Sequence, residues 1–291
     1  MNGVAVRRRE GALFPSIAGL WAVSLVAAPL LYVVAVSFLS RGRYGGVVSE
    51  PTLSNYARLA SPEYGPMILS ALGRSTALAA ANTLLCLAVA FPLVLFLVFG
   101  VERRWRNTLL LLLVFPFWTN FLIRTYAWFA LLSDGGWVNA ALAWLGLPEG
   151  NWLFTPRAVL LGMFYNYLPY MAVSLYLSVE RLDPLLLDAA SDLGGGRLAR
   201  FVKVVLPLSF PGILAGSVMV FIPSLGEFVI PDVLGGGTKL YVGNLLAQQF
   251  LTVRDWPFGS AITVGLLLVF AAGILAVRAR RKGGGPWTAE A

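Results

Sequence analysis

The sequence predicts an all-α integral membrane protein with six transmembrane helices. Of its 291 residues, 58% are hydrophobic and only 12% are charged, a balance that soluble globular domains do not have. The apolar residues form continuous runs, which indicates spanning helices, whereas the strands of a membrane barrel would alternate. Both observations place the chain in a lipid bilayer.

Six apolar segments are long enough to cross the hydrocarbon core, which takes about 20 helical residues. We expect these spans at residues 15–39, 68–99, 108–132, 158–179, 208–230 and 259–277. The first is too long for a secretion signal and lacks a clear small-residue cleavage site, so we expect it to be retained. The prediction is one membrane domain over 15–282, preceded by a cytoplasmic segment, 1–14, and followed by a flexible glycine-rich tail, 283–291.

Basic residues are distributed unequally between the two sides that these spans define. Fourteen lie on the side of the two termini and of the loops after the second and fourth spans, and seven lie on the other side. The positive-inside rule therefore predicts that both termini and the loop 180–207 are cytoplasmic. This topology explains the net charge of +8. A nucleic-acid partner is not expected, because the sequence has no basic folded domain to bind one.

The loop after the fourth span has the sequence of a two-helix elbow. Asp183-Pro184 is typical of a helix start, because aspartate caps free N–H groups and proline loses no hydrogen bond at the first helical position. We expect a short helix over 184–193, ended by the glycines 194–196, which tolerate positive φ. A second helix should begin near Arg197. Its apolar stripe would consist of Leu198, Phe201, Val202 and Val205.

Within this elbow, Asp188-Ala189-Ala190, three residues, Gly194, nine residues, Val204, any residue and Leu206-Pro207 resemble the EAA loop of binding-protein-dependent ABC importer permeases. Every spacing agrees, with Asp188 in place of the family's glutamate and Val204 in place of its isoleucine. The resemblance implies a coupling helix that sits in a groove of a cytoplasmic ATPase dimer. The residues it implies for this contact are Asp188, Ala189, Ala190, Gly194, Leu206 and Pro207. The alternative is an amphipathic helix pair at the membrane surface, but the full spacing between two spans favours the coupling loop.

Four further stretches, 117–128, 224–231, 243–246 and 248–259, resemble those of spermidine/putrescine importer permeases. The resemblance implies the type I ABC importer permease (MetI-like) fold, in which the first helix wraps a five-helix core and two permease subunits enclose the pathway. It further implies a second permease, by family habit a different chain, and an extracytoplasmic solute-binding protein. The implied location is the bacterial plasma (inner) membrane, and the implied cargo is spermidine or putrescine.

Several catalytic and nucleotide-binding patterns are missing from the sequence. There is no Gly-x-x-x-x-Gly-Lys-Ser/Thr loop, so we expect ATP and magnesium on the partner ATPase and no cofactor or metal on this chain. The chain has no histidine, and its one cysteine, Cys86, lies in an apolar run. We therefore expect a non-catalytic transport subunit. An autonomous secondary transporter or channel, with Glu227 as its ion site, and a membrane enzyme are the competing interpretations.

Two charged residues, Arg124 and Glu227, lie inside apolar runs, where an ionised group is costly. In one interpretation, Glu227 and Asp232 form an acidic lining of the pathway that offers transient partners to an amine. In the other, Glu227 pairs with Arg124 and holds helices together. Candidate aromatic contacts on the pathway are Trp118, Tyr126 and Trp128, because aromatic faces attract ammonium groups, although such residues also gather at membrane interfaces.

Overall fold

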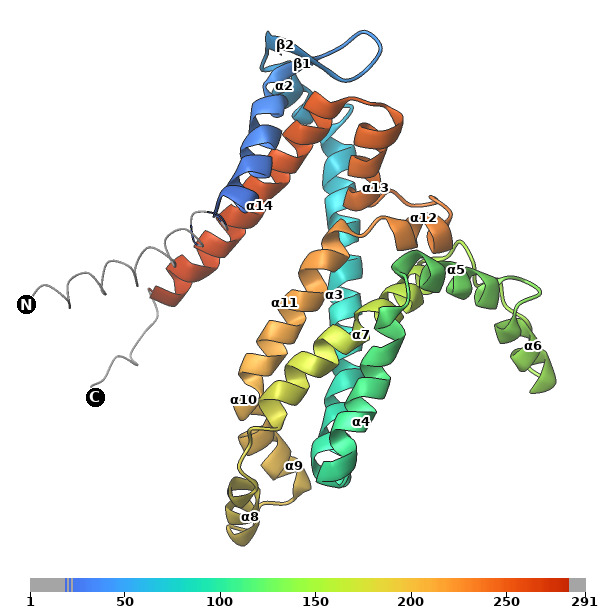
Figure 1. Ribbon diagram of the computed structural model, residues 1–291, viewed down its shortest axis with the longest axis vertical. Helices are drawn as coiled ribbons and strands as arrows, with labels where there is room; N and C mark the ends of the chain where they lie inside the picture. Colours follow the sequence, from blue (N-terminus) through green and yellow to red (C-terminus); the bar gives the residue numbers. More distant parts are fainter. Residues whose placement is uncertain (1–18, 20, 22, 283–291) are drawn as a thin grey trace, which may run out of the picture. The chain divides into compact units, whose positions relative to one another are not determined.

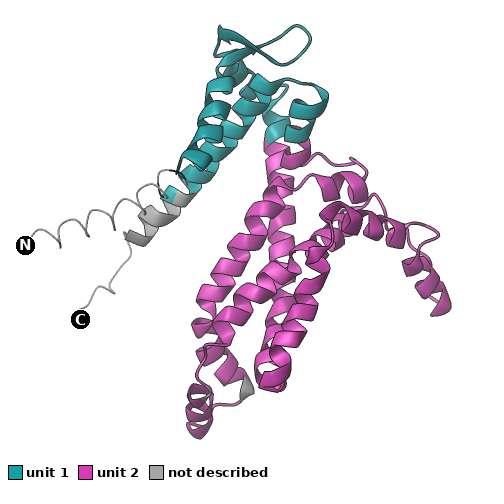
Figure 2. Ribbon diagram, in the orientation of Figure 1, with its two compact units in different colours: residues 1–68, 246–291 teal, residues 69–245 magenta. Residues whose placement is uncertain are grey.

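The computed structural model describes residues 19, 21 and 23–282 (Figure 1). The expected N-terminal segment 1–14 and tail 283–291 lie outside these residues. Two compact units are present: residues 1–68 with 246–291, and residues 69–245 (Figure 2). The single domain expected over 15–282 stays a prediction.

The first unit contains a small hairpin and helices from both ends of the chain. Its elements are the helix Val23–Ser37, β1 (Leu39–Arg41), β2 (Val47–Pro51), α2 (Ser54–Leu59), the π-helical turn η4 (Gln248–Thr252) and α14 (Trp256–Lys282). The two strands are antiparallel, with Ser40 opposite Val48. Gly45 and Gly46 turn the chain at φ of +92° and +79°, which glycine adopts without steric cost.

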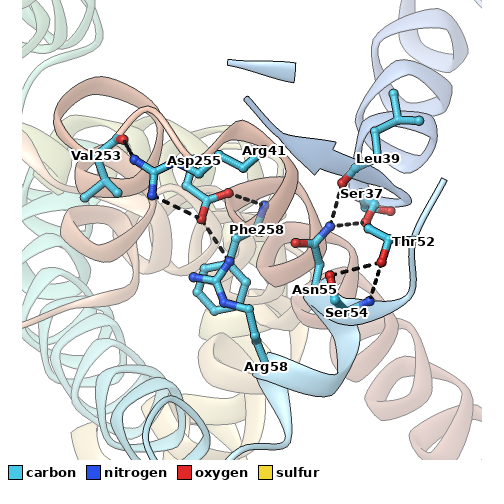
Figure 3. A network of polar contacts seen from close by, with 10 residues as sticks. All are labelled: Ser37, Leu39, Arg41, Thr52, Ser54, Asn55, Arg58, Val253, Asp255 and Phe258. Atoms are coloured by element: carbon cyan, nitrogen blue, oxygen red, sulfur yellow. Dashed lines mark hydrogen bonds and ion pairs between the residues drawn. The ribbon is translucent and has the colours of Figure 1, made fainter. Parts of the chain in front are cut away.

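A buried carboxylate organises this unit at the start of α14 (Figure 3). Asp255, only 1% exposed, caps the helix by accepting from the Phe258 N–H at 3.2 Å. The Arg58 guanidinium donates to Asp255 at 2.9 Å and lies 3.9 Å from the centre of the Phe258 ring. Burial lowers the pKa of Arg58, but hydrogen bonding and attraction to Asp255 and Tyr64 raise it further, so its pKa lies above the ordinary value. These contacts tie α2 to α14.

The second unit is a helical bundle. Its elements are α3 (Gly65–Leu95, from Leu69 onward), η1 (Phe96–Gly100), α4 (Arg103–Val114), η2 (Phe115–Trp118), α5 (Phe121–Leu132), α6 (Trp137–Trp144), α7 (Pro156–Val179), α8 (Pro184–Asp192), α9 (Arg197–Arg200), η3 (Phe201–Val205), α10 (Leu206–Leu208), α11 (Phe210–Gly226), α12 (Val229–Gly235) and α13 (Val242–Ala247, to Leu245). The buried core centres on α7, which packs on α11 and α12. Close packing of α11 on α7 requires a small residue at Gly212, where a Cβ would lie 2.9 Å from the Ser174 carbonyl oxygen.

Among the residues that the structure describes, three helical stretches are long and apolar enough to cross a membrane: Gly65–Gly100, Pro156–Val179 and Trp256–Gly273. They confirm the second, fourth and sixth expected spans. Two bent helix pairs raise the number to five if each counts as one span. The first expected span contains the shorter apolar helix Val23–Ser37, and the rest of it lies mostly outside the described residues, so this first span and the total of six stay predictions.

The third and fifth expected spans are not continuous helices, which corrects the sequence prediction. The third bends by 91° between Trp118 and Phe121, because Thr119 is extended and the Asn120 side chain caps a new helix by accepting from the Leu122 N–H at 2.8 Å. The fifth is helical only from Phe210 to Gly226, where the chain breaks before α12, and at Ser209 it is bent by 64° from the helix that precedes it. Apolar composition does not reveal such breaks.

Candidate functional site

The elbow predicted after the fourth span is present, and its helix boundaries are nearly as expected. Asp183 caps α8 by accepting from the Leu185 N–H at 3.0 Å. The helix ends in a turn in which Gly194 has φ of +76° and the Gly195 N–H donates to the Ala190 carbonyl at 2.9 Å. A second helix then begins at Arg197. Figure 1 shows this pair folded back beyond the end of α7.

The apolar stripe predicted for the second elbow helix is only partly buried. Val205 is buried and Phe201 is half-buried, but Leu198 and Val202 are largely exposed. The chain also changes from α-helix to the π-helical turn η3 at Phe201. The changed turn breaks the 3.6-residue period on which the prediction relied.

The residues expected to carry ATPase coupling are accessible on the elbow. Asp188, Ala189, Gly194, Leu206 and Pro207 are exposed, and Ala190 is half-buried. Four large apolar side chains accompany them on the surface: Leu185 (69% exposed), Leu186 (47%), Leu193 (89%) and Leu198 (75%). The two helices are also joined by a hydrogen bond that the sequence did not suggest, from Arg200 Nη1 to Ser191 Oγ at 2.8 Å.

Glu227 lies at the break between α11 and α12, and both of its carboxylate oxygens have partners. Oε1 accepts from the Val229 and Ile230 N–H groups at 3.0 and 3.4 Å, and thereby caps α12. Oε2 accepts from the Tyr167 hydroxyl of α7 at 2.8 Å. Gly243 allows α13 to approach this break, since a Cβ there would lie 2.6 Å from the Glu227 carbonyl oxygen.

Asp232, which lies on α12, has a partner of its own. Its Oδ1 accepts a short hydrogen bond from Asn244 Nδ2, which also donates to the Phe228 carbonyl at 3.1 Å. Asp232 itself is exposed, whereas Asn244 is buried and its Oδ1 has no partner among the described residues. Glu227 and Asp232 therefore belong to one locally braced segment, without a hydrogen bond between their carboxylates.

Arg124 does not pair with Glu227, so the ion-pair interpretation is wrong. Its guanidinium lies 4.4 Å from the centre of the Phe117 ring, and its Nε and Nη1 are buried without hydrogen-bond partners in the described part of the chain. Phe117 packs edge-on against Tyr170 at 5.5 Å, and Tyr170 lies 6.2 Å from Tyr167. Successive contacts through three aromatic rings thus connect Arg124 to the tyrosine that binds Glu227.

The structure places the three candidate pathway aromatics in different environments. Trp118 and Tyr126 are 80% and 59% exposed. Trp128 packs against the buried core and meets the Tyr165 ring at 5.4 Å. Their role on a pathway stays a prediction, and Trp128 has the environment of a packing residue.

Two buried polar contacts near the Glu227 break were missed from the sequence. Asn82 of α3 donates to Ser224 Oγ of α11 at 2.9 Å, and Ser75 Oγ accepts from the Val242 N–H at 2.9 Å. The available signal was a polar side chain within an apolar run, because such residues need partners in a bilayer. Across the residues described, no three acidic or cysteine side chains are grouped to hold a metal ion.

The chain belongs to the family described as binding-protein-dependent transport system inner membrane component, whose model matches residues 79–281. It is 41% identical over 257 residues to the spermidine/putrescine transport system permease protein PotB of Escherichia coli, covering 88% of this chain and 92% of that one. The PotB of Haemophilus influenzae is 39% identical, with 86% and 87% covered. The inner membrane ABC transporter permease protein YdcU of Escherichia coli is 31% identical, with 77% and 74% covered.

Solved structures show the same fold at low sequence identity. A bacterial ABC transporter involved in the import of the acidic polysaccharide alginate aligns with a TM-score of 0.66 at 16% identity, over 93% of this chain and 96% of that one. The alginate transporter in complex with its alginate-pentasaccharide-bound periplasmic protein aligns with a TM-score of 0.70 at 15% identity, over 94% and 95%. The chain therefore has the type I ABC permease fold and is a multi-pass membrane subunit of an ABC importer.

Proposed function

We propose that this chain is the permease subunit through which an ATP-driven importer moves a polyamine, spermidine or putrescine, across the bacterial inner membrane. The observation that supports a polyamine as the cargo is the 41% identity to PotB over most of both chains. This chain and a second permease, which has a different sequence, together enclose the pathway. An external solute-binding protein delivers the cargo, as the periplasmic partner of the alginate transporter illustrates for the fold.

The elbow 180–207 is the proposed attachment point for the ATPase dimer, which binds the ATP and magnesium that this chain has no motif to hold. This assignment is supported by the exposed apolar side chains of Leu185, Leu193 and Leu198, which lie on and around a helix capped by an aspartate and ended by a glycine. Exposed leucines on a polar loop are costly in water and favour a partner groove. In this proposal the elbow and both termini face the cytoplasm, in line with the excess of basic residues on that side.

Transport in this proposal is by alternating access. Closure of the ATPase dimer moves the elbow so that the pathway opens outward, and hydrolysis returns it to the inward-open form. Glu227, Asp232, Trp118, Tyr126 and Trp128 remain the candidate pathway residues. Both Glu227 oxygens already accept hydrogen bonds, but a carboxylate has about four acceptor positions, so Oε2 retains room for an ammonium group.

Reconstitution in liposomes tests the proposal. The chain is combined with its partner permease, ATPase and binding protein, and uptake of labelled spermidine and putrescine is measured with and without ATP. We expect uptake only when all four components and ATP are present. Gradient-driven flux through the purified chain alone would instead establish the autonomous transporter or channel.

The three elbow glycines offer a matched test of coupling. A side chain at Gly194 must adopt φ of +76°, whereas Gly196 has open space around its Cβ position and no positive φ. We expect Gly194→Val to insert in the membrane but to hydrolyse ATP without uptake, and Gly196→Val to retain coupling. Normal uptake by the Gly194 variant would remove that residue from the coupling role.

A further inference from the structure

The elbow has an inner side that holds it to the bundle as well as an exposed outer side. Leu182, Leu187 and Phe201 pack against the buried core of residues 69–245. The Ser191–Arg200 hydrogen bond joins α8 to α9 just before Phe201. Because the two helices are braced together, a displacement of the exposed surface also displaces Phe201.

Phe201 meets α3 through an aromatic contact with Phe91. The ring centres are 5.5 Å apart and the rings are nearly perpendicular, at 86°. Phe91 is 8% exposed, so its ring cannot move without moving its neighbours. Pro92 follows it inside α3 and removes the N–H that would bond the Ala88 carbonyl, and the π-helical turn η1 follows at Phe96. The contact therefore lies where α3 has fewer regular hydrogen bonds.

Farther along α3, two side chains hold the segments on either side of α12. Asn82, nine residues from Phe91 and about 13 Å along the helix axis, donates to Ser224, three residues before Glu227. Ser75 accepts from the Val242 N–H, which follows α12. One helix thus contacts the elbow at one point and both flanks of the Glu227 segment at two others.

The direct route along the chain from the elbow to Glu227 is less suited to transmit a displacement. Between α10 and α11 the helix axis turns by 64° at Ser209. The Ser209 hydroxyl is buried and has no hydrogen-bond partner among the residues that the structure describes. A push along α9 and α10 is consequently not directed along α11.

We propose that Phe201 and Phe91 are positioning residues that couple the elbow to the Glu227 break through α3. The inference rests on the proposed function, since it requires that an ATPase moves the elbow. Displacement of Phe201 shifts Phe91, α3 carries the shift to Asn82 and Ser75, and these move Ser224 and Val242. The segment that holds Glu227 and Asp232 then changes position when nucleotide binds inside the cell.

The test is a double-mutant cycle in the reconstituted complex with Phe91→Leu, Phe201→Leu and both together. Phe129→Leu is the matched control, because Phe129 also packs on the core and forms a ring pair, with Phe154 at 6.2 Å, that does not involve the elbow. We measure uptake per ATP hydrolysed, and nucleotide-dependent hydrogen exchange in residues 224–233. Leucine keeps the sites apolar, and thermal melting verifies that each variant is folded.

We expect each single variant to lower uptake per ATP by about threefold to tenfold and to weaken the exchange response to nucleotide. The double variant should be no worse than the worse single one, because the two rings act through each other. The control should keep the wild-type ratio. Additive losses, or a wild-type ratio in folded Phe201→Leu, would overturn the inference while leaving the proposed function intact. A wild-type complex that takes up cargo without ATP would overturn both.

Discussion

Replacement of Glu227 by glutamine and by alanine separates its structural contribution from its charge. In the wild type the Val229 and Ile230 N–H groups lie 3.0 and 3.4 Å from Glu227 Oε1. Glutamine keeps an oxygen that can accept from both, and its amide can donate to the Tyr167 hydroxyl. Alanine removes the cap and leaves the Tyr167 hydroxyl, in a side chain only 9% exposed, without its acceptor. The two variants therefore differ in hydrogen bonding, while both remove the charge.

The expected magnitudes follow from these contacts. Loss of a helix cap costs about 1 kcal/mol, and a buried hydroxyl without a partner costs about 1–3 kcal/mol. We expect Glu227→Ala to lower the free energy of unfolding by about 2–4 kcal/mol, and Glu227→Gln by less than about 1 kcal/mol. The assay is denaturant titration of the purified chain in mixed micelles, followed by tryptophan fluorescence.

Tyr167→Phe is the matched control, because it removes only the hydroxyl that donates to Glu227. In the Glu227→Ala background this substitution should cost less than in wild type, since the hydroxyl no longer has its acceptor. Equal destabilisation by glutamine and alanine would refute the capping argument. If glutamine preserves stability but lowers polyamine uptake, the charge itself acts on the cargo.

Three further substitutions test the packing and polar contacts. Gly212→Leu should separate α11 from α7, because a Cβ there would lie 2.9 Å from a backbone oxygen and closer still to Ser178. We expect the free energy of unfolding to fall by more than about 2 kcal/mol in the same titration. Gly73→Leu is the control that should be tolerated, because the Cβ position of Gly73 has open space. Asp255→Asn keeps a capping side chain but weakens the 2.9 Å pair with Arg58. Because that guanidinium is about one-third exposed, we expect the free energy of unfolding to fall by only about 1–2 kcal/mol, with faster hydrogen exchange in α2. Unchanged exchange would contradict the role of the pair. Asn139→Ala removes hydrogen bonds to the Asp134 and Gly150 carbonyls and should make the loop after α6 more sensitive to proteolysis. Unchanged proteolysis would show that these bonds do not hold the loop in place.

Much of the fold was predictable because its causes are local. A continuous apolar run of about 20 residues must form a helix in lipid, where every backbone N–H and C=O needs a partner within the segment. The long spans at Gly65–Gly100 and Pro156–Val179 follow from this rule. The elbow was predictable for the same reason: Asp183 caps its own helix and Gly194 adopts the positive φ that ends it.

The breaks within the third and fifth apolar runs were not predictable from composition. Asn120 and Glu227 each cap a new helix inside an apolar run, and hydropathy does not distinguish a capping side chain from an ordinary buried one. The π-helical turn at Phe201 likewise shifts a helical period that the sequence pattern assumes to be constant.

The sequence by itself determined the membrane class, the elbow and the importer branch, because these depend on apolar run length, capping residues and motif spacing along the chain. Only the tertiary structure decided which partners the intramembrane charges have. Glu227 could have paired with Arg124, but the fold brings the Tyr167 hydroxyl to it and places the Phe117 ring beside Arg124. The choice among partners far apart in the sequence is made by helix packing, which fixes side-chain distances that no local pattern contains.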